Sequence, residues 1–235
     1  MKNAPERLKT REGLYPRVLG VRFVLLPRTL RLLHGRGGRQ RYRGEAEVER
    51  GPGLCSRLFA RIAGLPKAHA GPIEVEIDAG PRGETWTRRF GKSAMRSRLL
   101  ERDGLVFERL GPMRFAFAFA LELSGELPEA AASGVLSLQT GAAVTVSSAL
   151  SPSPMSGGMG QLSMSEGADE DANEPGLTWR LVRVRALGLP LPLGWFGGVR
   201  AREFERDGRY RFDVRAALPG IGLLVHYQGW LDVEG

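Results

Sequence analysis

Hydrophobic and polar residues alternate along several stretches of the chain, and a period of two predicts β-strands. In residues 72–79, PIEVEIDA, the apolar residues Ile73, Val75 and Ile77 fall on one face and the acidic residues on the other. Residues 83–90, GETWTRRF, follow a short Gly-Pro-Arg-Gly turn, as the second strand of a hairpin would.

Further strands are predicted at residues 105–110, 112–123, 177–187, 199–205, 208–217 and 221–233. The clearest is PMRFAFAFALEL, in which large apolar residues alternate with alanines from Phe115 to Ala120. Because these strands follow one another without helices between them, we expect an antiparallel sheet curled into a barrel or half-barrel.

Two short helices are predicted nearer the N-terminus. The first lies within residues 16–34 and is broken at Pro27. The second lies within residues 53–66, GLCSRLFARIAGLP, where apolar residues recur at helical spacing from Leu54 to Ile62. The expected fold class is therefore mainly β (α+β), an antiparallel curled sheet or barrel-like domain with two short N-terminal helices.

Residues 127–175 interrupt the strand pattern. They are rich in Ala, Ser, Gly and Met, and no Lys or Arg occurs between Arg114 and Arg180. This composition predicts a disordered, low-complexity insertion between two strands. The basic residues 1–13 are predicted to form a disordered tail, so we expect a single β-rich domain over residues 14–235.

The net charge of +8 is spread unevenly. Residues 1–43 hold twelve Lys and Arg against two acidic residues, whereas the remainder has slightly more acids than bases. The arginines of residues 36–43 resemble an RNA-binding segment, but only Tyr42 is there to stack on a base. The sequence then passes into GEAEVERG, so we expect these arginines to pair with acids of a neighbouring strand. Nucleic acid is the less favoured partner, and an anionic ligand or membrane head group stays open.

Several segments, read in order, resemble a known family. They are LPRTLRLLHG, GEAEVERGPG, LFARIAGLP, ETWTRRFG, LVFERLGPMRFAF, LGLPLP and FDVRAALPGIGLLVHYQGWL. Together they resemble the bacterial domain-of-unknown-function family DUF4166, over residues 14–126 and 177–232. Members of that family stand alone or follow a Rossmann domain related to saccharopine dehydrogenase. The resemblance implies a fold relationship and service beside a redox or lipid-type partner, such as a Rossmann-type oxidoreductase. It implies no activity, because none is established for the family.

Conventional catalytic motifs are sparse. There is no G-x-G-x-x-G fingerprint, and we expect no cofactor. The three histidines, His34, His69 and His226, are far apart in the sequence, and without H-x-x-x-H or C-x-x-C spacing no metal site is expected. The one cysteine, Cys55, lies on an apolar helix and is expected in the core. A single cysteine and the lack of an apolar signal segment favour a cytoplasmic location, and no stretch is long enough to span a bilayer.

Charged residues beside aromatic ones are better candidates for a binding site. Trp86 and Arg88 share a face of residues 83–90, and Glu108 points away from its neighbour Arg109. An inward Glu or Arg beside Trp is costly unless it is paired or meets a ligand. Such a set predicts a polar-lined cavity in a barrel, and the alternative is a solvent face with cross-strand ion pairs.

The last strand carries two more candidates. In VHYQGWL, Trp230 shares a face with His226, Tyr227 lies on the other face, and Gly229 permits close approach of another chain segment. His34, at the end of the first predicted helix, is a candidate ligand contact or acid/base group, or a simple helix cap.

The favoured function is binding of a small, mostly apolar ligand with a polar or acidic head, in a cavity between the Phe115–Phe119 face and Trp230. The expected ligand-binding residues are His34, Trp86, Arg88, Glu108, Arg109, Tyr227 and Trp230. One alternative is an auxiliary domain of an oxidoreductase system, with His34 or Glu108 as general acid or base. The other is binding of nucleic acid or an anionic surface through the basic N-terminus.

Overall fold

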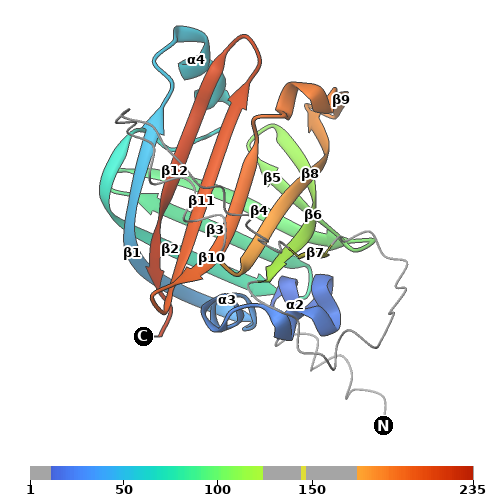
Figure 1. Cartoon of the computed structure of the whole chain (residues 1–235). Helices are drawn as coiled ribbons and strands as arrows, with labels where there is room; N and C mark the ends of the chain where they lie inside the picture. The colour runs from blue at the N-terminus through green and yellow to red at the C-terminus, as the bar shows by residue number, and fades with distance from the viewer. Residues whose placement is uncertain (1–11, 124–143, 147–173, 235) are drawn as a thin grey trace, which may run out of the picture.

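The fold is a closed antiparallel β-barrel (Figure 1). The computed structural model describes residues 12–123, 144–146 and 174–234. Within these residues ten strands form the barrel wall, in the order β6-β5-β4-β3-β2-β1-β12-β11-β10-β8. Strand β8 pairs back onto β6 and closes the wall, so the sheet has no long free edge along this ring.

The wall strands are β1 (Gly38–Arg50), β2 (His69–Gly80), β3 (Gly83–Phe90), β4 (Ser93–Arg102), β5 (Leu105–Leu110), β6 (Met113–Leu123), β8 (Gly176–Ala186), β10 (Arg200–Arg206), β11 (Arg209–Leu218) and β12 (Gly222–Asp232). Two short strands, β7 (Val144–Val146) and β9 (Leu189–Leu191), pair with β6 and β8 respectively. The helices are α2 (Leu14–Leu19), η1 (Gly20–Leu25), α3 (Arg28–His34), α4 (Leu54–Ile62) and η3 (Leu193–Phe196).

The predicted fold class is confirmed, and most predicted strands are found within a few residues of their expected limits. Strand β4 was not predicted, although its sequence also alternates, with Met95, Ser97 and Leu99 turned inward. Most of the predicted insertion lies outside the described residues, as does residue range 1–11 of the predicted tail.

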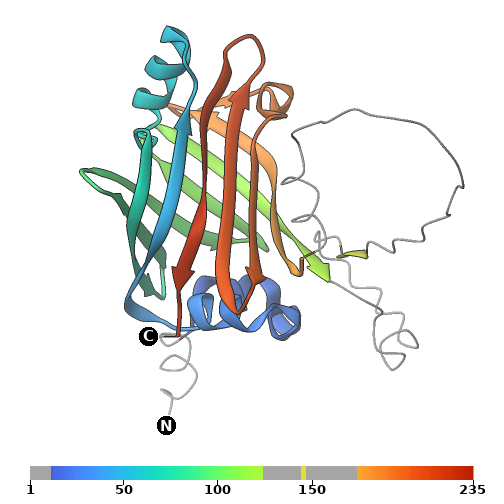
Figure 2. The same ribbon diagram turned by 60° about the vertical axis from the view of Figure 1, so that its left-hand side comes forward.

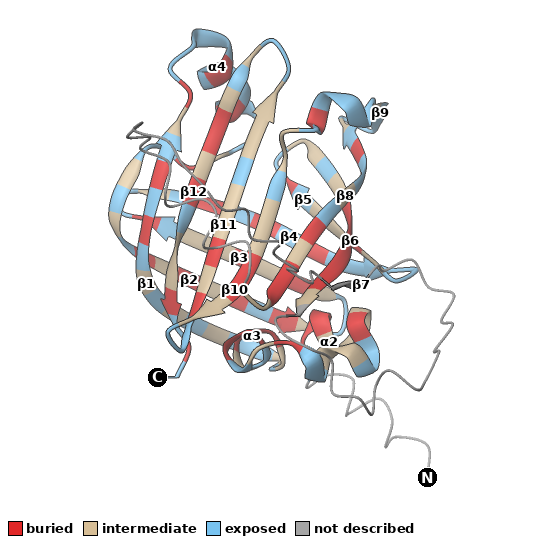
Figure 3. Cartoon of the chain, in the orientation of Figure 1, coloured by how far each residue is buried: buried red, intermediate tan, exposed pale blue. Residues whose placement is uncertain are grey.

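The hydrophobic core lies inside the barrel, and buried residues recur along the strands of its wall (Figure 3). Alternate residues of each strand point inward, and the buried set includes Val75, Phe90, Leu99 and Phe119. In β2 the predicted apolar face is the inward one, because Ile73, Val75 and Ile77 are all buried. The period of two therefore identified the core face of this strand correctly.

Helices α2 and α3 lie across one end of the barrel, called the closed end below (Figures 1 and 2). Leu14 and Tyr15 of α2, and Leu30 and Leu33 of α3, are almost completely buried and belong to the same core as the strands. Burial of these side chains excludes water from that end.

Helix α4 stands at the opposite end, called the rim below (Figure 2). It contacts β12 through its small residues: Ser56 and Ala60 are buried, and the Ser56 hydroxyl donates to the carbonyl of Leu223. The predicted apolar face is therefore wrong as a core face, because Leu54 is 82% exposed. Cys55 is exposed as well, contrary to the expectation that it would be in the core.

Candidate functional site

A buried polar cluster lies where α2 and α3 meet the barrel. The His34 Nε2 atom is 2.6 Å from Glu203 Oε2, and the Tyr15 hydroxyl donates to Glu203 Oε1 at 3.2 Å. Because an ionised carboxylate only accepts, the His34 Nε2 atom carries the hydrogen of this bond. The His34 side chain has no solvent exposure, and the cluster joins three segments of the chain in the buried interior.

Aromatic rings enclose this cluster. The Tyr15 ring stacks on the His34 ring with centroids 3.5 Å apart, and the Trp86 and Tyr210 rings lie 5.6 and 6.0 Å from it. Nearby, Glu84 accepts from the backbone N–H of Leu14 at 2.5 Å and from the Trp86 indole at 2.9 Å. These contacts attach α2 to the barrel beside His34, whose own side chain has no exposed surface.

The tyrosines of this interior have perturbed acidities. Burial raises the pKa of Tyr227 to about 12. Burial, reinforced by the nearby Glu203, raises the pKa values of Tyr15 and Tyr210 well above the ordinary value of 10.0. Burial also raises the pKa of Tyr42, so each of the four tyrosines in the chain holds its proton more tightly in the native state.

We expect the phenols to ionise only as the protein unfolds in alkali. The unfolded chain releases these protons near pH 10, whereas the native chain keeps them. The contribution of the tyrosines to the free energy of unfolding is therefore fully present below pH 10, and it is lost as the pH rises through the native pKa values. Tyr227 alone contributes about 3 kcal/mol of this loss between pH 10 and its native pKa of about 12. Phenolate absorbance and circular dichroism, followed together during the titration, test this. In urea the four phenols should titrate near pH 10, and gradual titration near that pH in a folded chain contradicts the expectation.

Arg88 lies farther from the closed end than this cluster, on the inward face of β3. Its guanidinium donates to the Ser97 hydroxyl at 3.3 Å and lies 4.6 Å from the centre of the Trp86 ring. No carboxylate of the described residues forms an ion pair with it within 4.0 Å. Glu108, on the inward face of β5, is near enough to favour the charged guanidinium without touching it. A guanidinium cannot lose its proton in a protein, so this interior contains a permanent positive charge.

The interior is not equally buried along its length. Beside the closed end, Glu84, Trp86 and Tyr210 are buried. Toward the rim, Phe90 and Met95 are also buried, whereas part of the surface stays exposed at the inward-facing residues Arg88, Glu108, Leu181, Val214 and Ala216. Partial exposure of side chains that the strand register turns inward indicates that solvent reaches this half of the barrel. A charged group, a carboxylate and apolar walls meet there.

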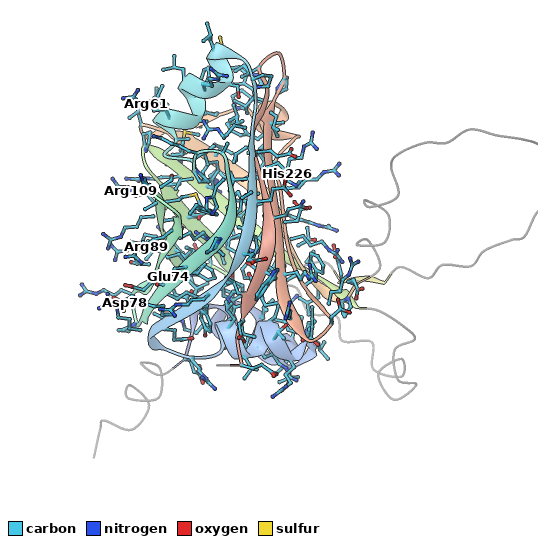
Figure 4. The ribbon with its side chains drawn as sticks, turned by 90° about the vertical axis from the view of Figure 1, so that its left-hand side faces the viewer. Arg61, Glu74, Asp78, Arg89, Arg109 and His226 are labelled. Atoms are coloured by element: carbon cyan, nitrogen blue, oxygen red, sulfur yellow. The ribbon has the colours of Figure 1, made fainter. Side chains whose placement is uncertain are left out.

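Four of the seven predicted site residues face this interior: Trp86, Arg88, Glu108 and Tyr227. His34 lies in the closed-end cluster, fully enclosed. Arg109 points away from the barrel (Figure 4). Trp230 is also on the outer face, under the Arg209 guanidinium. The predicted cavity wall at Trp230 is therefore wrong, and Tyr227 is the aromatic residue of β12 that faces the core.

The arginines near the N-terminus pair as predicted. Arg39 donates two hydrogen bonds to Glu76, and Arg41 contacts Glu74 and Glu76 on the neighbouring strand β2. The Arg39 hydrogen bonds hold the pKa of Glu76 below its ordinary value. Arg89 of β3 completes this network from the other side, so much of the local positive charge is neutralised on the outer wall.

Sequence comparison assigns the fold to a family. The model of the family described as "Domain of unknown function (DUF4166)" matches residues 26–231, a range that holds all ten wall strands except the last residue of β12. The chain belongs to the DUF4166 family. No curated protein matches the chain.

The described residues contain no group of three or more His, Cys, Asp or Glu side chains arranged to hold a metal ion. None of the helices in the described part of the chain is long and apolar enough to cross a bilayer.

Sequence reasoning missed the acceptor on which the closed end depends. Glu203 lies on β10, in RAREFER, where Ala201, Glu203 and Glu205 alternate with basic and aromatic residues. This strand has acids on one face and arginines on the other, and that pattern was the signal in the sequence from which a functional Glu203 could have been predicted. Tyr15 had no such signal, because it acts from a helix at the other end of the sequence.

Proposed function

We propose that this DUF4166 domain binds a small amphipathic molecule in the rim-side half of its barrel, with the polar or anionic head against Arg88. The observation that carries the proposal is the inward guanidinium, which has Ser97 and the Trp86 ring as partners and no described carboxylate within 4.0 Å. A charge inside a barrel is costly unless a counter-charge meets it, and a ligand carboxylate supplies one.

The apolar part of the ligand would contact the walls opposite Arg88. Leu181, Val214 and Ala216 are hydrophobic, inward-facing and only partly buried, so a chain of methylene groups would remove their remaining surface from water. Apolar walls with a few polar anchors are typical of small-molecule sites. Tyr227 and Glu108 lie beside the same space and would contact the head.

Oleate, with oleyl alcohol as the neutral analogue, tests this proposal. We expect Arg88→Gln to weaken oleate binding at least thirtyfold, because losing the partner of a buried charge costs about 2 kcal/mol or more. Binding of oleyl alcohol should change much less. Glu108→Gln should strengthen oleate binding, since it removes a negative charge from the same interior. Titration calorimetry on each purified variant measures both ligands.

Arg109→Gln is the matched control, because Arg109 is next to Glu108 in β5 but points outward. It should leave both affinities unchanged. A native chain that binds neither ligand would reject the proposal, as would an Arg88→Gln variant that is folded and still binds oleate like the native chain. Thermal unfolding of each variant separates loss of the site from loss of the fold.

A further inference from the structure

The rim of the barrel has an unusual apolar surface. On α4, the side chains of Leu54, Leu58, Phe59 and Ile62 are all exposed. Beyond β8, the exposed apolar residues are Leu187, Leu189, Leu193 and Trp195, of which Leu187 is 83% and Trp195 57% exposed. Clusters of this kind on a soluble domain mark interaction surfaces.

These two groups lie at the same end of the barrel and are joined by the β5–β6 turn (Figures 1 and 2). A Cβ atom built on Gly111 would lie 3.4 Å from the carbonyl oxygen of Ile62. On the other side of the turn, the carbonyl of Pro112 accepts from the backbone N–H of Leu187 at 3.2 Å. The end of α4, the turn and the β8–β9 connection are therefore adjacent.

The charges at the rim are all of one sign. The segments that form it are residues 51–68, 91–92, 111–112, 187–199 and 219–221. Their sequences contain Arg57, Arg61, Lys67 and Lys92, and no Asp or Glu. An apolar surface whose connecting segments have basic but no acidic residues is complementary to an anionic, amphipathic partner.

A row of arginines lies just below the rim on the outer wall. Arg98, Arg109, Arg114 and Arg185 are cross-strand neighbours on β4, β5, β6 and β8. Neighbouring strands are about 4.8 Å apart, so four guanidinium groups follow one another around the wall. Arg109 and Arg114 are each two residues from the β5–β6 turn. Figure 4 shows Arg109 pointing into solvent on this side.

The charge of this row is not neutralised by the described residues. Arg98, Arg109, Arg114 and Arg185 have no hydrogen bond or ion pair with them, and they line an outer groove of about 750 Å³ together with Arg183. The groove also has three acidic residues. Glu101 accepts from the Gly104 backbone, Asp103 pairs with Arg102, and Glu108 faces inward, so none of them pairs with the row.

We infer that the rim docks onto an anionic phospholipid membrane. The apolar side chains of α4 and the β8–β9 connection would enter the boundary between head groups and acyl chains. The arginine row, two residues farther from the end, would then meet lipid phosphates. Arginine suits this role because its planar fork binds phosphate oxygens in pairs. This inference goes beyond the proposed ligand site and does not depend on it.

Flotation with lipid vesicles tests the inference on the full chain. We expect binding to phosphatidylcholine vesicles that contain phosphatidylglycerol, weaker binding to pure phosphatidylcholine, and a decline as salt rises. Leu58→Ser/Phe59→Ser should weaken binding by about tenfold. Arg109→Gln/Arg114→Gln should weaken binding to the anionic vesicles on the order of 20-fold, because each basic residue near such a surface contributes about a factor of five.

Two matched controls carry the same substitutions at the closed end. Val24→Ser/Leu25→Ser removes exposed apolar residues of η1, and Arg31→Gln/Arg36→Gln removes exposed arginines. Both should bind like the native chain, and equal losses in rim and control variants overturn the inference.

Absence of binding to anionic vesicles at low salt also overturns it. If the native chain is a dimer that Leu58→Ser/Phe59→Ser converts to a monomer, a second copy covers the rim and membrane docking is wrong. The ligand proposal is tested separately: Arg88→Gln should leave vesicle binding intact, whereas Arg109→Gln should weaken it without changing oleate affinity.

Discussion

Replacing Glu203 by alanine is expected to lower the free energy of unfolding by about 3 to 5 kcal/mol. Glu203 accepts from the His34 ring and the Tyr15 hydroxyl, in a region from which the two helices exclude water. Without it, two donors stay buried and unpaired, each at a cost of about 1 to 3 kcal/mol. For a domain of this size the midpoint of thermal unfolding should fall by about 10 °C.

Urea unfolding followed by tryptophan fluorescence measures this effect, since Trp86 lies beside the cluster. Glu203→Gln should cost less than Glu203→Ala, because the amide oxygen still accepts one of the two bonds. Glu47→Ala, at an exposed site on β1, should change stability by less than about 0.5 kcal/mol. Equal stability of Glu203→Ala and the native chain would mean that the closed end does not depend on this cluster.

Replacing Gly44 by alanine should also cost several kcal/mol. A Cβ atom at Gly44 would lie 1.8 Å from the carbonyl oxygen of Trp230 and 2.9 Å from the Cα of Leu231, both in the main chain of β12. Because the atoms it would meet belong to the main chain and not to a flexible side chain, β1 and β12 must separate or twist to make room for the methyl group. Overpacking of this kind costs about 3 kcal/mol. Gly229 on β12 is equally close to the main chain of β1, since its Cβ would lie 2.2 Å from the Glu45 carbonyl oxygen.

Gly80→Ala is the control for this substitution. Gly80 is at the end of β2, has no positive φ, and has open space where a Cβ would lie. Alanine should be neutral there or stabilise by up to about 1 kcal/mol, because it restricts the unfolded chain. Denaturant midpoints of the two variants make the comparison. A Gly44→Ala variant as stable as Gly80→Ala would show that the strands can move apart without loss.

Four of the seven predicted site residues face the interior, and the alternation along single strands shows which of the predicted residues share a face. Trp86 and Arg88 share a face with Phe90, and the burial of Phe90 makes that face the inner one. The same rule separates Glu108 from Arg109, which the fold places inside and outside the wall. It also separates Tyr227 from Trp230, but the sequence could not say which of the two faces the core. A period of two divides residues between faces, and only the closure of the sheet decides which face is inside.

The sequence by itself determined that the chain is mainly β, where most strands lie and which side chains share a face, because backbone alternation is local and survives in any sheet. The tertiary structure decided the rest. It brought Glu203 to His34, which is 169 positions away in the sequence, by packing α3 against β10. It closed the barrel by joining β6 to β8. It turned the apolar face of α4 toward solvent, since the small residues Ser56 and Ala60 allow the closer approach to β12. These outcomes depend on register, closure and helix docking, which are set by contacts between distant segments.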